Sequence, residues 1–249
     1  MMVKTKLEAL SKNKTYQKSR RSIPFFFTFA NALFGFLSII QALEENYTAA
    51  IYCLMCAALM DLLDGRIARK MGTTSLLGAE LDSLADAISF CLAPCILLYA
   101  WYPGTIGYTG IIALGLYISA GIFRLAKFNV TSEQQSTNFI GLPTPIAAFF
   151  VISLVLYSHW ILNHSLSFLL YKRIPFILVA SIAFLMISSI PFPSFKKSHR
   201  SLFTFSCIAL CFIWLVVTLF STKSFPLPLI AVSFYIIASI LRWLVTKKL

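Results

Sequence analysis

The chain has 249 residues, of which 59% are hydrophobic and only 12% are charged. Soluble domains usually carry about 25% charged residues, so this composition excludes an ordinary soluble globule and an intrinsically disordered protein. The formal net charge is +12, but no basic helix or aromatic RNA-binding motif accompanies it, so we expect no nucleic-acid partner. Composition therefore predicts a membrane protein with several spans, whose basic segments face anionic headgroups.

Apolar segments long enough to cross a bilayer recur along the chain after a basic N-terminal tail, residues 1–22. A hydrocarbon core of about 30 Å needs roughly 20 helical residues. Lipid offers backbone groups no hydrogen-bond partner, so each span is expected to be a helix. Eight spans are predicted, at residues 23–43, 47–70, 81–102, 106–128, 143–162, 174–191, 202–220 and 225–245.

The distribution of basic residues predicts which ends of the spans face the cytoplasm. Eight spans put both termini on one side, which then carries 18 of the 21 Lys and Arg residues. The positive-inside rule identifies that side as cytoplasmic. Lys172 and Arg173 fall on the other side, and a re-entrant segment at residues 165–171 would change the count. The expected fold is an all-α, polytopic bundle of about eight transmembrane helices with cytoplasmic termini.

The four aspartates of the chain lie within 26 residues, at the end of the second span and the start of the third. They are Asp61, Asp64, Asp82 and Asp86. The first two are spaced i,i+3 and the last two i,i+4, so each pair lies on one helix face. A short turn near residues 71–75 makes the two helices antiparallel neighbours. Four converging carboxylates need cations to stay ionised, and oxygen ligands suit Mg²⁺ or Mn²⁺.

Small and basic residues accompany the aspartates. Gly65 and Ala68 leave one helix face open, and Gly78 does so one turn before the third aspartate, so a phosphate ester can approach the backbone. Arg66 and Arg69 can bind phosphate oxygens. Carboxylates, a metal and arginine together indicate phosphoryl-type transfer. The alternative is plain salt bridging between the two helices, which leaves the glycine and alanine positions unexplained.

The stretch from Asp61 to Asp86 resembles the signature of the CDP-alcohol phosphotransferase family, D-x2-D-G-x2-A-R-x8-G-x3-D-x3-D, at every fixed position and gap. The resemblance implies Mg²⁺ or Mn²⁺, as two ions, bound by Asp61, Asp64 and Asp82. It also implies that Asp86 lies at the metal centre as ligand or base, so that Asp82 and Asp86 are the expected catalytic residues. Binding of the CDP moiety is associated in this family with the positions of Gly65, Ala68, Arg69 and Gly78.

Further stretches resemble the bacterial phosphatidylserine synthases of the same superfamily. They are residues 81–99, 123–130 and 139–148. The resemblance covers roughly residues 23–165, the expected catalytic core, with residues 1–22 as a cytoplasmic tail and residues 166–249 as C-terminal transmembrane helices. It implies direct transfer of a phosphatidyl group from CDP-diacylglycerol to L-serine, giving phosphatidylserine and CMP. It further implies a homodimer in the bacterial inner membrane, with the active site on the cytoplasmic side.

The end of the fourth span carries the expected acceptor-binding residues. Arg124 or Lys127 is expected to take the carboxylate of the amino acid, and Asn129 to orient it. The alternative is that the two cations only snorkel to the interface. Thr144 either lines the same site or only starts a helix.

Some positions depart from the pattern of the related enzymes. Phe25 stands where they often have a polar residue that faces the nucleotide lipid, Cys91 replaces a usual glycine, and Lys127 replaces a usual arginine. Asn31 and Gly35 still fit the pattern. The departure at Phe25 bears on the details of CDP binding more than on the class of reaction.

The same residues are also compatible with other acceptors and with two other classes of membrane protein. Glycerol 3-phosphate or inositol phosphate would be accepted by the same chemistry in a more basic cavity. A divalent-cation transporter would use the four aspartates as its ion site, and a structural membrane protein would tolerate their substitution. The chain has no HxKxxxxD motif, which excludes the phospholipase D-like type of phosphatidylserine synthase. Buried or lipid-facing thiols, rather than metal ligands, are expected at Cys53, Cys56, Cys91, Cys95, Cys207 and Cys211.

Overall fold

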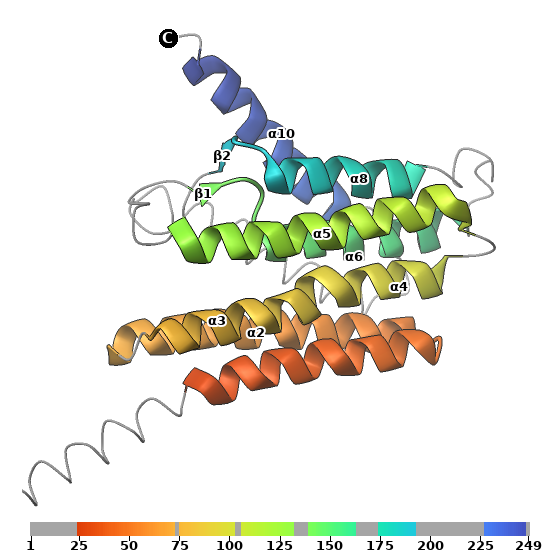
Figure 1. Cartoon of the computed structure of the whole chain (residues 1–249). Helices are drawn as coiled ribbons and strands as arrows, with labels where there is room; N and C mark the ends of the chain where they lie inside the picture. Colours follow the sequence, from red (N-terminus) through yellow and green to blue (C-terminus); the bar gives the residue numbers. More distant parts are fainter. Residues whose placement is uncertain are drawn as a thin grey trace, which may run out of the picture.

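The computed structural model of the chain describes residues 24–72, 75–102, 106–131, 139–162, 174–192 and 227–247. These residues form helices that lie side by side in a bundle, with α10 crossing the others at a steep angle (Figure 1). The predicted span at residues 202–220 lies outside the described residues, as do the basic tail, residues 165–173 and Cys207 and Cys211.

The first two helices form an antiparallel hairpin. The first helix spans Pro24–Leu43, and α2 spans Tyr47–Met71. The side chain of Asn46 caps α2 by accepting a hydrogen bond from the N–H of Ala49. Gly72 ends α2 in the left-handed conformation, with φ of 62°, which a residue without a side chain adopts at no steric cost.

The third span is one continuous helix, Leu76–Trp101, with a π-helical turn inside it. It consists of α3 (Leu76–Asp86), the π-helical turn η1 (Ala87–Leu92) and α4 (Ala93–Trp101). The predicted start at residue 81 is wrong, because the Ser75 hydroxyl accepts a hydrogen bond from the N–H of Gly78 (3.1 Å) and starts the helix earlier.

The remaining described elements follow the predicted spans closely. Helix α5 spans Gly107–Thr131, α6 spans Thr144–Leu162, α8 spans Ile174–Ile187 and α10 spans Leu227–Lys247. The predicted end of the sixth span at residue 191 is wrong: after α8 the chain forms β2 (Pro191–Phe192), which pairs antiparallel with β1 (Phe139–Ile140). This short pairing was not predicted, because two-residue strands leave no periodic pattern in the sequence.

Among the described residues, four helices are long and apolar enough to cross a membrane. They are Pro24–Leu43, Tyr47–Met71, Leu76–Trp101 and Gly107–Thr131. Shorter apolar helical segments cover Thr144–Leu156, Ile174–Ile187 and Val232–Leu241. The helical membrane fold is therefore confirmed, while the count of eight spans and the cytoplasmic termini stay predictions.

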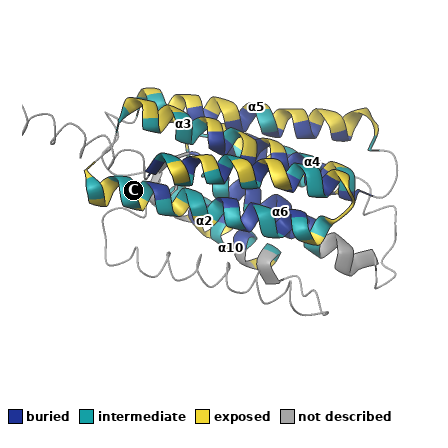
Figure 2. Ribbon diagram, turned by 90° about the horizontal axis from the view of Figure 1, so that it is seen from below, coloured by how far each residue is buried: buried dark blue, intermediate teal, exposed yellow. Residues whose placement is uncertain are grey.

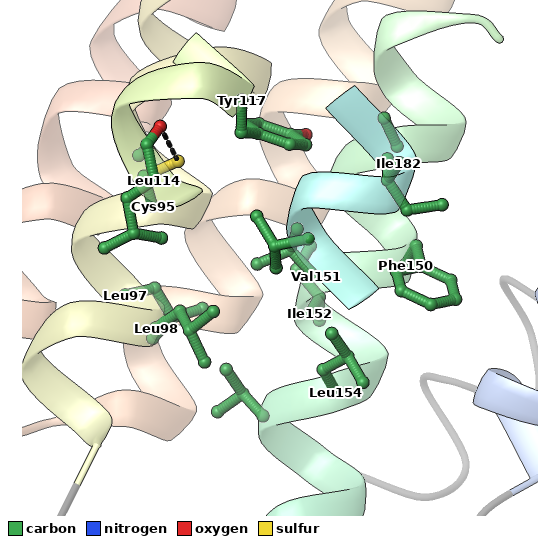
Figure 3. Close-up of a cluster of buried hydrophobic side chains, with 14 of the residues drawn as sticks. Cys95, Leu97, Leu98, Leu114, Tyr117, Phe150, Val151, Ile152, Leu154 and Ile182 are labelled. Carbon is green, nitrogen blue, oxygen red and sulfur yellow. Dashed lines mark hydrogen bonds between the residues drawn. The ribbon is translucent and has the colours of Figure 1, made fainter. Parts of the chain in front are cut away.

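The apolar core lies between the second half of the third span and the helices that follow it. Figure 3 shows side chains of α4, α5, α6 and α8 meeting there, among them Leu97, Tyr117, Val151 and Ile182, all buried. The expected burial of Cys91 and Cys95 is confirmed, and Cys53 and Cys56 are half-buried free thiols.

The outer faces of several helices are also apolar. Figure 2 shows exposed residues along the outside of α5, which include Ile112 and Leu116, and the first helix exposes Phe29, Leu33 and other large apolar side chains. Soluble proteins rarely expose apolar surface of this extent. Helices that are apolar both inside and outside the bundle are expected of a protein that is surrounded by hydrocarbon.

Candidate metal centre and acceptor site

Three of the four aspartates come together between α2 and α3. Asp61 and Asp64 on α2 and Asp82 on α3 each offer a carboxylate oxygen, and these oxygens lie within 4.8 Å of one another. Asp64 is buried, and the Oδ1 atom of Asp82 is buried with no hydrogen-bond partner among the described residues. A buried oxygen without a donor is costly, so this donor set fits a hard cation that prefers oxygen ligands.

The first helix supports one of these carboxylates. The hydroxyl of Thr28 donates a hydrogen bond to Oδ2 of Asp64 at 2.9 Å, and both side chains are buried. Groups that hydrogen-bond to metal-binding carboxylates orient them and tune their affinity. The role of Thr28 had a visible signal in the sequence, because Thr28 and Asn31 are polar residues spaced i,i+3 in the otherwise apolar stretch of residues 24–37.

Asp86 stands beside the three-carboxylate group and is not a member of it. Its Oδ1 atom accepts a hydrogen bond from Nδ2 of Asn31 at 3.1 Å, and the backbone carbonyl of Asn31 accepts one from the Ser89 hydroxyl at 2.9 Å. Asp86 also interacts electrostatically with Asp61, Asp82 and Asp64. The fourth aspartate thus lies at the edge of the three-carboxylate group, a difference that helix spacing alone did not reveal.

Gly35 makes this contact between the first helix and η1 possible. A Cβ atom at Gly35 would collide with the Ser89 hydroxyl and would lie 2.8 Å from the Ser89 Cα atom. The first helix therefore approaches the backbone of η1 as closely as it does because residue 35 has no side chain. The close approach is what brings Asn31 within reach of Asp86.

The residues expected to bind the CDP moiety line the same end of α2 and α3. Arg69 is exposed and interacts electrostatically with the three grouped carboxylates. Its Nη1 atom lies 3.4 Å from where a Cβ atom at Gly65 would be, which is an ordinary van der Waals distance, so the guanidinium lies against the surface of Gly65. On α3, Gly78 faces the ring of Phe25, whose Cε1 atom lies 3.4 Å from the corresponding Cβ position. Phe25 therefore packs against this motif glycine in place of a polar residue.

The structure distinguishes the two cations at the end of α5. Arg124 is buried, with 9% of its surface exposed, and Nη1 donates a hydrogen bond to the hydroxyl of Thr144 at 3.2 Å. Its Nε atom has no partner among the described residues, and the guanidinium interacts electrostatically with Asp86. Lys127 is exposed. Arg124 is thus placed toward the carboxylates. Of the two cations, only the exposed Lys127 fits the alternative in which the side chain snorkels to the membrane interface.

Asn129 contacts two side chains of α3. Its Oδ1 atom accepts a hydrogen bond from the Ser83 hydroxyl at 3.0 Å, and its Nδ2 atom donates one to Oε2 of Glu80 at 3.1 Å. Neither Ser83 nor Glu80 was predicted from the sequence. No periodic signal could have done so, because these contacts depend on how α3 and α5 are rotated against each other.

The apolar helices and the carboxylates grouped at one end of them indicate an integral membrane protein with a candidate metal site. The family model described as CDP-alcohol phosphatidyltransferase matches residues 21–187, and the chain belongs to this family. The match includes the first helix, all four aspartates and Arg124.

Curated relatives carry names that describe one reaction class. The chain is 34% identical over 233 residues to a CDP-diacylglycerol–serine O-phosphatidyltransferase of Helicobacter pylori, covering 89% of this chain and 90% of the relative. It is 36% identical over 132 residues to the enzyme of the same name from Bacillus subtilis, covering 53% and 74%. An archaetidylserine synthase of Methanothermobacter thermautotrophicus is 38% identical over 137 residues, covering 54% and 58%.

Proposed function

We propose that this protein transfers the phosphatidyl group of CDP-diacylglycerol to L-serine and releases phosphatidylserine and CMP. The observation that carries the proposal is the group of three carboxylates between α2 and α3, in a chain that aligns along 89% of its length with a relative named for this reaction.

The proposed metal ligands are Asp61, Asp64 and Asp82, with Asp86 at the edge of the same centre. The donor set fits Mg²⁺ or Mn²⁺ because it consists of oxygens only and includes a buried oxygen without a donor. The resemblance to the family implies two such ions. When bound, the ions supply charge stabilisation to the phosphoryl oxygens. Thr28 holds Asp64 in place for this purpose.

Asp86 is the proposed base. Asn31 holds one of its oxygens, which orients the carboxylate within the buried end of α3. Asp86 takes the proton of the serine hydroxyl, and the serine oxygen attacks the phosphorus that is esterified to diacylglycerol. The bond between this phosphorus and the CMP oxygen then breaks, with no covalent enzyme intermediate. Arg69 binds the phosphate oxygens on which negative charge develops.

The surface of small residues beside Arg69 forms the proposed CDP site. Gly65 and Gly78 carry no side chain on α2 and α3, and Ala68 adds only a methyl group to that surface. A pyrophosphate can therefore approach both helices closely. Phe25 bounds this site at Gly78 and restricts the space on that side.

Arg124 is the proposed ligand of the serine carboxylate. A buried guanidinium keeps a strong preference for an anionic partner, and Nε of Arg124 offers an N–H without a partner among the described residues. Thr144 holds the opposite edge of the guanidinium. Arg124 is also the single buried Lys or Arg side chain among the described residues, which favours a carboxylate acceptor over a doubly charged phosphate.

We further propose the membrane arrangement that the charge distribution predicts. Eight spans would place both termini in the cytoplasm, in a bacterial inner membrane, with residues 23–165 as the catalytic core of a homodimer. Support comes from the described basic residues at the end of α2 and from Lys127 near the end of α5, which lie on the same side as the carboxylates. Labelling of single cysteines in the two termini from either side of sealed vesicles tests this arrangement.

CMP release by the purified protein tests the reaction itself. The assay contains CDP-diacylglycerol and Mn²⁺ or Mg²⁺, with and without L-serine. We expect CMP and phosphatidylserine to form together and only with serine. CMP that forms only with glycerol 3-phosphate or inositol phosphate would replace the acceptor and keep the reaction class. Folded protein that releases no CMP with any acceptor, yet carries Mn²⁺ into liposomes, would overturn the proposal.

A further inference from the structure

Asn129 forms a two-point polar contact between α5 and α3. A carboxamide offers an acceptor oxygen and two donor hydrogens. In Asn129 the oxygen accepts from Ser83 at 3.0 Å, and the nitrogen donates to Glu80 at 3.1 Å. Both ends of the amide are therefore engaged by α3, on either side of Asp82 in the sequence.

The part of α3 that receives this contact has little apolar packing to hold it. None of the residues 76–84 is buried, and Leu76, Leu77 and Leu84 are among the exposed apolar side chains. Burial in α3 begins only at Ala85 and Asp86. Core packing therefore reaches the first two turns of α3 only indirectly, through the continuous helix that leads into η1 and α4, and Phe25 is the apolar side chain that lies against Gly78.

The rotation of α3 matters because of where its carboxylates lie. At 3.6 residues per turn, Glu80 and Ser83 share one face, and Asp82 and Asp86 share another, about a third of a turn away. Side-chain atoms lie about 5–6 Å from the helix axis, so a rotation of roughly 20° would move a carboxylate oxygen by roughly 2 Å. Metal ligands tolerate displacements of only about 0.5 Å.

We propose that Asn129 is a positioning residue, which fixes the rotation of α3 through Glu80 and Ser83 and so holds Asp82 at the metal centre. The inference rests on the proposed function for the identity of the site. It differs from the role predicted from the sequence, in which Asn129 orients the acceptor, because here Asn129 acts on the metal ligands through α3.

An exchange of the two hydrogen-bonding groups tests the proposal. Asn129→Asp keeps an acceptor for Ser83 but loses the donor to Glu80 and sets two carboxylates against each other. Adding Glu80→Gln restores a donor and an acceptor in reversed order. Mn²⁺ affinity is measured by electron paramagnetic resonance of the free ion, and kcat and the KM for serine by CMP release. Glu80→Gln alone is the matched control, because a glutamine oxygen still accepts from Asn129.

We expect Asn129→Asp to weaken Mn²⁺ binding by about 10–100-fold, the usual effect of removing a group that orients metal ligands. The double variant should recover most of this loss, with the KM for serine close to that of the wild type. Asn129→Ala, which removes both hydrogen bonds without adding charge, should show the same loss of Mn²⁺ affinity with or without Glu80→Gln. This variant also serves if Asn129→Asp does not fold.

Two results would overturn the positioning role. One is wild-type Mn²⁺ affinity in folded Asn129→Asp or Asn129→Ala. The other is a loss in Asn129→Asp that Glu80→Gln does not restore and that appears as a raised KM for serine, which would mean direct contact with the acceptor. Since Mn²⁺ binding is measured without acceptor, recovery in the double variant would stand even if the wild type released no CMP with serine.

Discussion

The two halves of the third span are held in place by different forces. In α4, most side chains are buried, among them Ala93, Leu97, Leu98 and Trp101. In α3, residues 76–84 include no buried side chain, and the helix is fixed by the cap at Ser75 and the hydrogen bonds to Asn129. One continuous helix thus combines an apolar anchor with a polar end that carries the chemistry.

This difference indicates that different parts of the molecule determine its stability and its activity. Apolar packing around α4 and η1 holds the bundle together, because burial of apolar side chains against one another excludes voids and retains close packing. Polar contacts from the first helix and from α5 place the carboxylates of α2 and α3. Changes at the polar end should therefore alter activity more than stability, and changes in the packed half should do the reverse.

The largest effect is expected for Asp82→Asn. The substitution keeps the shape of the side chain but removes the charge that binds the metal, so serine-dependent CMP release should fall by at least about 100–1000-fold. Thermal unfolding in detergent should stay at or above the wild-type temperature, because repulsion from Asp64 is removed. Glu45→Gln, in the turn before α2, is the control with the same charge change. Full activity in folded Asp82→Asn would contradict the metal assignment.

Gly35→Ala tests the contact between the first helix, which supports the carboxylates, and η1, which belongs to the packed part of the third span. The new methyl group would lie 2.8 Å from the Ser89 Cα atom, so the first helix must move away from η1. We expect a loss of about 1–3 kcal/mol of stability, as for other overpacked sites, together with lower activity because Asn31 moves away from Asp86. Gly115→Ala is the matched control: a Cβ atom there meets nothing within 4 Å. Equal melting temperatures for the two variants would show that this close approach is unimportant.

Thr28→Val should change metal binding with little effect on the fold. Valine keeps the shape of threonine but cannot donate to Asp64, so Mn²⁺ affinity should fall by about 10–100-fold. The control is Ser38→Ala in the same helix, because the Ser38 hydroxyl is buried with no hydrogen-bond partner among the described residues. If both variants bind Mn²⁺ as the wild type does, Thr28 has no part in the metal centre.

The smallest effect is expected for Tyr117→Phe in the packed half. The Tyr117 hydroxyl is fully buried and donates to the backbone carbonyl of Phe90 in η1 at 3.0 Å. Its loss should cost about 0.6–2 kcal/mol, the range found for hydrogen bonds inside membranes, and should leave Mn²⁺ affinity unchanged. Tyr108→Phe, at an exposed tyrosine, is the control. A drop in Mn²⁺ affinity without a drop in melting temperature would contradict the separation of the two halves.

The sequence alone predicted the helical membrane fold and most of the aspartate cluster. Four of the eight predicted spans match described helices long enough to cross a bilayer, because hydropathy reports apolar helices of that minimum length. Motif spacing predicted that all four aspartates converge, because i,i+3 and i,i+4 spacings place residues on one helix face. The structure groups Asp61, Asp64 and Asp82 within 4.8 Å and leaves Asp86 beside them. Helix ends were less accurate where a cap, such as Ser75, lies outside the apolar stretch.

Only the tertiary structure decided how these helices are rotated against one another. It set Asp86 apart with Asn31, joined Thr28 to Asp64, and directed Arg124 toward Thr144 rather than outward beside Lys127. It also tied Asn129 to α3. Each contact joins residues that are well separated in the chain and depends on helix rotation, and the contact of Asn31 with Asp86 also depends on close approach at Gly35. Local periodicity determines which residues share a face of one helix, but the partner of that face is determined by packing between helices.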